Sequence, residues 1–163
     1  MKKTLPVVVC LISLTLMLSA CGDQPSPSAV IQPAQTSSES FVVAGDYELH
    51  YNALRTDQLT ADIARAYGIE RSKNKVLLNV SVLQKNAGAA STAIDATVSL
   101  VARNLNGQIK NAPLRRIAES NAIYYIGEVS FSGAETMVFE ITATPAGSSI
   151  PIAATMTREF FAD

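Results

Sequence analysis

The 163-residue chain is poor in the side chains on which most thiol enzymes and metal sites depend. It has two cysteines, one histidine and no tryptophan. Both cysteines, Cys10 and Cys21, lie near the N-terminus, so the body of the protein contains no thiol. This distribution argues against a disulfide scaffold, a cysteine nucleophile and a zinc site built from cysteine and histidine.

Charge is also scarce, because only 17% of the residues are charged and the two signs nearly cancel. The chain has 13 basic and 14 acidic residues. Removal of an N-terminal export signal containing Lys2 and Lys3 would leave 11 basic residues and a net charge of −3. Nucleic-acid binding needs a clustered basic surface, so we expect no nucleic-acid partner.

The first 20 residues have the pattern of an export signal. Lys2 and Lys3 precede an apolar run from Leu5 to Leu18, which is too short for the roughly 20 residues of a membrane span. The run ends in Leu18-Ser19-Ala20-Cys21, which resembles the bacterial lipobox. This resemblance implies cleavage before Cys21 and diacylation of its sulfur, with the membrane as a partner. Gly22, rather than aspartate, follows the cysteine, which favours the outer membrane.

Residues 21–40 are predicted to form a lipidated N-terminus and a flexible linker. Gly22 to Ser40 contains three prolines and five serines, with Val30-Ile31 as its only apolar pair. Such a segment cannot bury enough apolar surface to compensate for the entropy of ordering. A flexible linker of this length spans roughly 24 Å, so the folded domain can stand clear of the membrane.

Residues 41–163 are predicted to form an all-β domain. Apolar and polar residues alternate in successive runs, as in the segments that start at Tyr47, Val76, Ile94 and Ile123 and in a last run from Ile150. Turn residues separate these runs, including Asn106-Gly107. The pattern predicts an immunoglobulin-like antiparallel sandwich of seven or eight strands, with a closed barrel as the alternative. The predicted core comprises Tyr51, Leu78, Val80, Val98, Leu100, Tyr125, Val129, Phe139 and Ile141.

One segment breaks the alternation and predicts a short helix over residues 59–68. Thr60 is the expected N-cap, and Gly68 suits the left-handed position after the helix. Ile63 and Tyr67 are four residues apart and should pack onto the sheets. We expect this helix either to plug an open end of the sandwich or to form a binding surface.

Three short segments resemble a family of small exported Gram-negative proteins known only as a domain of unknown function. They are Tyr51-Asn52-Ala53-Leu54, Tyr67-Gly68-Ile69-Glu70-Arg71-Ser72 and Asn79-Val80-Ser81-Val82. The resemblance covers most of residues 41–161. It implies a β-sandwich envelope protein, and it supplies no catalytic residues and no cofactor.

We expect the helix and the loop that follows it to form the contact site for an envelope partner. We identify Tyr67, Arg71, Ser72 and Lys73 as candidate partner-binding residues, because the connection is longer than a sandwich hairpin needs. Arg71 offers a planar set of donors for a carboxylate or phosphate. Tyr124 is expected to be exposed on its strand.

Two other functions remain as alternatives to a non-catalytic binding or accessory module. His50 lies near Glu48 and could serve an enzyme site, although the chain has no Gly-x-Ser-x-Gly motif. Met137 and Met156 could belong to a metal carrier, but both are in phase with core residues. We therefore expect no enzyme activity, no metal and no cofactor.

Overall fold

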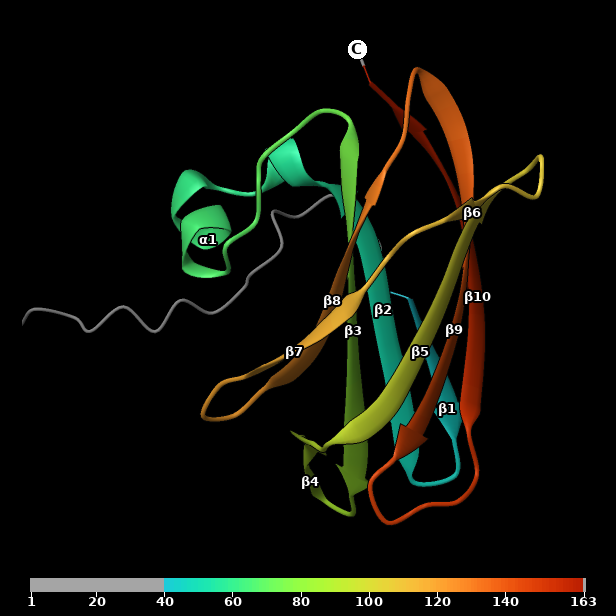
Figure 1. Cartoon of the computed structure of the whole chain (residues 1–163). Helices are drawn as coiled ribbons and strands as arrows, with labels where there is room; N and C mark the ends of the chain where they lie inside the picture. Colours follow the sequence, from blue (N-terminus) through green and yellow to red (C-terminus); the bar gives the residue numbers. More distant parts are fainter. Residues whose placement is uncertain (1–39, 163) are drawn as a thin grey trace, which may run out of the picture.

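The computed structural model describes residues 40–162, which form two packed antiparallel β-sheets (Figure 1). One sheet has six strands in the order β1-β2-β3-β8-β7, with β4 also paired to β3, and the other has the order β10-β9-β5-β6. The predicted all-β sandwich is therefore confirmed, and the closed barrel is wrong. The predicted signal peptide, Cys21 and almost all of the predicted linker lie outside the described residues.

The strand bounds explain why the structure has more strands than the sequence predicts. The six-stranded sheet contains β1 (Ser40–Ala44), β2 (Tyr47–Arg55), β3 (Lys75–Asn86), β4 (Ala89–Ala93), β7 (Leu114–Ala118) and β8 (Ile123–Ser130). The four-stranded sheet contains β5 (Ala96–Asn104), β6 (Ile109–Lys110), β9 (Ala134–Pro145) and β10 (Ile152–Phe161). Three of these strands, β1, β4 and β6, have only two to five residues and carry too little alternation to be recognised.

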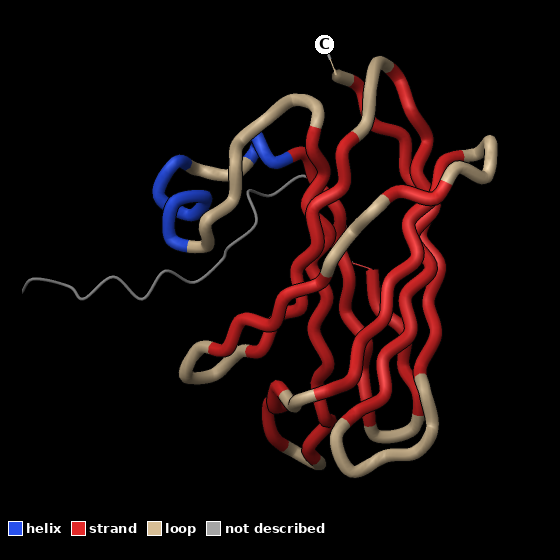
Figure 2. The backbone as a smooth tube through the Cα atoms, viewed as in Figure 1, coloured by secondary structure: helices blue, strands red, loops and turns tan. Residues whose placement is uncertain are grey.

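The chain between β2 and β3 holds both helical segments. They are a 3-10 turn, Thr56–Gln58, and helix α1, Ala61–Ala66. Figure 2 shows them together on one side of an otherwise strand-dominated molecule. In the part of the chain that the structure describes, no helix has both the length and the apolar character needed to cross a membrane.

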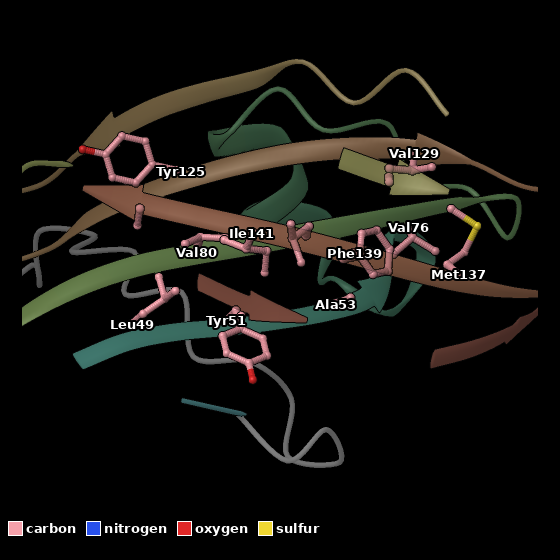
Figure 3. Packing of buried hydrophobic residues seen from close by; sticks show 14 of the residues in the cluster. Leu49, Tyr51, Ala53, Val76, Val80, Tyr125, Val129, Met137, Phe139 and Ile141 are labelled. Atoms are coloured by element: carbon pink, nitrogen blue, oxygen red, sulfur yellow. The ribbon is translucent and has the colours of Figure 1, made fainter. Parts of the chain in front are cut away.

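The main core lies between the two sheets, as the alternation predicts (Figure 3). Seven of the nine predicted core residues are buried, and Phe139 and Leu78 have no exposed surface. Val98 and Leu100 are half-buried and pack against this core. The inward phase was therefore identified correctly in every strand that contributes to the predicted core.

The last strand starts two residues later than the alternation predicts. Ile150 was expected to begin it, but β10 begins at Ile152 and the Ile150 side chain is 73% exposed. Pro151 separates the two residues, and a proline has no N–H with which to extend a ladder. Ile150 therefore belongs to the preceding turn.

Candidate interaction surface

A second hydrophobic cluster lies on the outer face of the six-stranded sheet, beneath α1. Leu77 of β3 and Ile126 of β8 point away from the main core, because side chains alternate along a strand. Both are nevertheless buried, at 2% and 1% exposure. The cluster comprises Leu59, Ala64, Tyr67, Ile69, Leu77 and Ile126, with Leu54, Ile63, Ile117 and Tyr124 packed around it.

This cluster decides how the helix is placed. Figure 1 shows α1 beside the six-stranded sheet, on the side away from the four-stranded sheet. The helix therefore covers an outer face and does not plug an end of the sandwich. Tyr124 was expected to be exposed, but it is half-buried against this cluster, because the helix covers that part of β8.

The ends of α1 follow the predicted capping pattern. The Thr60 hydroxyl oxygen accepts a hydrogen bond from the Ile63 N–H at 3.3 Å. Gly68 has a φ of +60°, a conformation that glycine adopts without steric cost. The Ile69 N–H then donates to the Ala64 carbonyl at 2.8 Å, which closes the helix. Local signals thus determine where this short helix begins and ends.

Tyr67, one of the four candidate partner-binding residues, is an internal anchor with 7% of its surface exposed. Its hydroxyl donates to the Glu119 carboxylate, and the Arg115 guanidinium donates to its main-chain carbonyl. Burial and the neighbouring carboxylate of Glu119 raise the pKa of the Tyr67 phenol above its usual value. These contacts join the end of α1 to the hairpin of β7 and β8.

Ser72 is held by the 3-10 turn. The hydroxyl of Thr56, which is completely buried, donates to the Ser72 carbonyl at 3.1 Å. The Ser72 N–H donates back to the same hydroxyl oxygen at 2.9 Å. One side chain therefore satisfies both main-chain groups of a residue 16 positions away, and Ser72 is half-buried as a result.

Arg71 and Lys73 are the two candidates that are exposed to solvent. Arg71 donates to the Asp57 carbonyl at 2.8 Å, which holds its guanidinium at the surface. Nearby, Lys75 pairs with the Glu70 carboxylate. This pairing lowers the pKa of Glu70, through the hydrogen bond first and the charge of Lys75 second. The structure thus places Arg71, Ser72 and Lys73 on one braced loop, a few residues after the buried Tyr67.

His50 lies on the outer face of β2 and pairs with Glu48. Its Nε2 atom is 3.0 Å from the Glu48 carboxylate, and their side chains are 18% and 22% exposed. The Phe41 ring stacks on the imidazole with a centroid separation of 5.2 Å and an interplanar angle of 17°. The arrangement is a half-buried histidine-carboxylate pair on the outer face of the sheet, partly covered by Phe41.

The two methionines of the described residues belong to the main core. Met137 has no exposed surface, and Met156 is half-buried against the core. Within residues 40–162, no group of three or more histidine, cysteine, aspartate and glutamate side chains is placed to hold a metal ion.

Sequence reasoning missed a polar network that joins the two sheets. The Tyr125 hydroxyl donates to Asp95 at 2.6 Å and accepts from the Ala96 N–H at 2.7 Å. Arg116 forms two hydrogen bonds with the same carboxylate, at 2.9 and 2.7 Å. The Arg116 bonds, followed by the Tyr125 bond, lower the pKa of Asp95 to about 2. The sequence predicts that Tyr125 lies in the core, but nothing in it predicts the hydrogen bond from the Tyr125 hydroxyl to Asp95.

Two arginines bridge the edges of the sandwich where β2 and β10 face each other. Arg158 of β10 donates to the Ala53 carbonyl of β2 at 2.6 Å, and Arg55 of β2 donates to the Phe161 carbonyl of β10 at 2.5 Å. Asp57 holds the Arg55 guanidinium with two bonds of 3.1 Å. The Ala53 carbonyl lies beyond the start of β1, because the pairing of β1 with β2 runs only from Tyr47 to Tyr51.

Together, these features define an antiparallel β-sandwich that carries a braced helix and loop on one outer face. The comparisons with known proteins identify its family. A family model described as a domain of unknown function, DUF4426, matches residues 41–163. The chain belongs to this family, which confirms the resemblance to a family of unknown function.

One solved structure agrees with this family assignment, and two others share the fold. The chain is 30% identical to the DUF4426 family protein PA0388 from Pseudomonas aeruginosa PAO1, with a TM-score of 0.64 over 77% of this chain and 96% of that one. FetP from uropathogenic Escherichia coli, expressed in the periplasm of E. coli, is 14% identical with a TM-score of 0.52. That match covers 75% of this chain and 93% of FetP.

A copper-bound variant of FetP is 15% identical, with a TM-score of 0.52 over 74% of this chain and 93% of that one. At this level of identity, the likeness to FetP concerns the fold alone. The chain has no match among the curated proteins.

Proposed function

We propose that this chain is a lipid-anchored protein of the cell envelope whose β-sandwich acts as a non-catalytic binding or accessory module. Cys21 carries the anchor, and the domain faces the periplasm from the outer membrane. The exposed residues Arg71 and Lys73 contact an acidic surface of an envelope protein, on a loop positioned by Tyr67 and Ser72.

One observation carries the binding part of this proposal: the helix and its loop are braced against an outer face of the sheet. Thr56 holds Ser72, Glu119 holds Tyr67, and the second hydrophobic cluster holds the helix. A pre-ordered loop loses little entropy when a partner binds, which favours affinity. Arg71 and Lys73 therefore stand on a scaffold suited to recognition.

The roles of the polar clusters support a module without catalysis. Asp95, Arg116 and Tyr125 bond to one another where the two sheets meet, which gives them a structural role. Lys110 and Glu135 pair at 2.8 Å and hold the β5–β6 hairpin to β9. Catalytic groups are usually found converging in a concave site, whereas His50 and Glu48 lie on a sheet face.

The proposed lipid anchor rests on the sequence, and the proposed location is supported by the sequence and by a likeness of fold. Leu18-Ser19-Ala20-Cys21 has the four residues of a lipobox at the end of an apolar run. FetP, which shares the fold, was expressed in the periplasm. Acyl chains contribute about 0.8 kcal/mol per buried methylene, so two or more chains hold a protein stably at a membrane.

The anchor is tested by Cys21→Ser. We expect the wild-type chain to incorporate labelled palmitate and to sediment with outer-membrane vesicles, and the variant to do neither. Cys10→Ser is the matched control, because it removes the other cysteine from within the signal and should leave labelling intact. Equal labelling of wild type and Cys21→Ser would contradict lipidation at this residue.

The contact surface is tested by the double variant Arg71→Ala/Lys73→Ala. We expect its melting temperature to change little and its crosslinking to envelope partners in intact cells to fall several-fold. Lys85→Ala/Arg103→Ala is the matched control, because it removes two positive charges elsewhere on the domain. A large loss of stability in the first variant would show that the loop is internal scaffolding, and equal crosslinking would exclude it as the contact.

A further inference from the structure

A groove of about 350 Å³ lies between β4 and the turn that joins β7 to β8. In Figure 1, both elements lie at the same side of the molecule, below the helix. Nine residues line the groove: Ala90, Ser91, Thr92, Ala93, Glu119, Ser120, Asn121, Ala122 and Ile123. None of them is aromatic, five are alanine or serine, and Glu119 is the charged one.

The groove forms because the partner of β3 changes along its length. The ladder between β3 and β8 stops at Val80 and Tyr125. From Leu83 onward, β3 pairs with β4 instead. The start of β8 therefore diverges from β3 and pairs with β7 alone. One edge of β4 thus faces the groove with no strand beside it among the described residues.

The hydrogen bonds identify which main-chain groups of β4 face the groove. The Ile94 N–H donates to the Val82 carbonyl of β3 at 3.0 Å, and the Ala90 carbonyl accepts from the Asn86 side chain at 2.8 Å. Main-chain groups alternate in direction along a strand. The N–H and C=O groups of Ser91 and Ala93 therefore point away from β3, toward the groove.

The other edges of the described sheets are protected. Edge strands usually carry charges or prolines, or are covered, because open edges attract other strands. Arg115 and Arg116 lie in β7, and Arg158 and Glu159 lie in β10. Strand β6 has only two residues and so offers a very short edge, and β1 is protected because it lies against β10. By contrast, β4 (Ala89–Ala93) has neither a charged residue nor a proline.

We propose that this groove binds an extended peptide segment of a partner protein, which adds as a strand to β4 and places a lysine or arginine beside Glu119. The small side chains of both walls let a peptide backbone approach to strand distance. The Tyr67 hydroxyl donates to the Glu119 carboxylate and fixes its position. A buried apolar ligand would need several aromatic or large apolar side chains around it, whereas Ile123 is the one large apolar residue among those that line this groove.

The shape of the groove favours a single strand over a second copy of the chain. The β7–β8 turn stands on the far side of the groove as a wall. Symmetric pairing of two β4 edges would bring a second such wall, and a sheet behind it, into the same space. The groove shares Glu119 with the bracing of the Arg71 and Lys73 surface, because Glu119 accepts the Tyr67 hydrogen bond. Ser91 takes no part in that bracing, so a variant of Ser91 tests the groove independently of the proposed function.

The test selects peptides from a phage-displayed library of random dodecapeptides on the full mature chain. We expect enrichment of sequences with a basic residue and good strand formers. Ser91→Pro removes one N–H that faces the groove, and proline is tolerated at an open strand edge. This substitution should weaken the binding of the selected peptides at least ten-fold. Ser91→Ala, the matched control, keeps that N–H and should bind them like the wild type.

Two further measurements keep the result interpretable if Ser91→Pro fails to fold. Bound peptide should slow hydrogen exchange of the Ser91 and Ala93 amides at least ten-fold. Glu119→Gln keeps an acceptor for Tyr67 but removes the charge, so it should weaken basic peptides several-fold. No enrichment, or no change in exchange at β4, would overturn the proposal. A dimer in sedimentation that Ser91→Pro abolishes would assign the edge to a second copy instead.

Discussion

Leu77 and Leu78 are neighbours in β3 and are both buried, yet they belong to different hydrophobic clusters. Leu78 points between the sheets, and Leu77 points outward beneath α1. Leu100, on the inner face of the other sheet, is only half-buried. The cost of truncating each leucine therefore depends on what covers it, and the residue type alone does not decide it.

We expect Leu78→Ala to lower the free energy of unfolding by about 2–5 kcal/mol, as deletion of fully buried side chains does. Leu100→Ala should cost clearly less, because part of that side chain already contacts water and its surroundings can relax. Urea unfolding of the two variants and the wild type measures the difference. Equal losses would show that Leu100 is as deeply packed as Leu78.

At the scale of elements, the connection between β2 and β3 is held by side chains that reach across it. Thr56 bonds to both main-chain groups of Ser72, and Arg71 bonds to the Asp57 carbonyl. An α-helix of six residues is not stable alone, so packing and these bonds keep it in place. The Thr56 hydroxyl, which holds Ser72, is completely buried and would not contact a partner, whereas Arg71 both braces the loop and is exposed.

Thr56→Val tests this bracing, because it keeps the shape of the side chain and removes the hydroxyl. The two main-chain groups of Ser72 would lose their partner, which should cost about 1–3 kcal/mol. Hydrogen exchange of the Ser72 amide should become faster in the same variant. Thr56→Ser keeps the hydroxyl and should retain Ser72 protection, so equal exchange in the two variants would contradict the bracing role.

At the scale of the whole molecule, polar contacts supplement the apolar core in joining the sheets. Tyr125 and Arg116 of the six-stranded sheet bond to Asp95, next to the start of β5 in the other sheet. Arg55 and Arg158 bridge the facing edges of β2 and β10. The two sheets are therefore linked by charged groups at separate places around the core.

The Asp95 network predicts a dependence of stability on acid. The pKa of Asp95 is lowered from 3.8 to about 2 in the folded protein, so ionisation of this group stabilises the fold above pH 4. This contribution should fall as the pH decreases from about 4 to 2. Unfolding free energies of wild type and Asp95→Asn should differ most at neutral pH and converge near pH 2.

Tyr125→Phe provides a second check on the same network. It removes one of the hydrogen bonds to Asp95 and leaves both bonds from Arg116. The variant should therefore show a weaker loss of stability between pH 4 and 2 than the wild type. The free energy of unfolding of Asp95→Asn could instead change with pH in parallel with that of the wild type between pH 4 and 2. That result would show that ionisation of Asp95 does not contribute to the acid dependence of stability.

The sequence by itself determined the features that depend on neighbours along the chain. Period-two alternation identified the inward faces of the strands, including Leu78, Tyr125 and Phe139, because side chains of a strand alternate wherever it lies. Thr60 and Gly68 identified the ends of the helical segment through local capping chemistry. The family resemblance rested on equally local segments.

Only the tertiary structure decided which outward-facing residues are covered and which distant groups meet. Tyr67 and Glu119 are 52 residues apart, and Arg158 and Ala53 are 105 apart. Their contacts depend on the order of strands in each sheet and on the place where the β2–β3 connection folds back. Local periodicity determines neither the strand order nor the place where this connection folds back, because the same alternation is compatible with many strand orders. For that reason the sequence indicated the loop as a surface, and the fold showed that Tyr67 and Ser72 brace it while Arg71 and Lys73 are exposed.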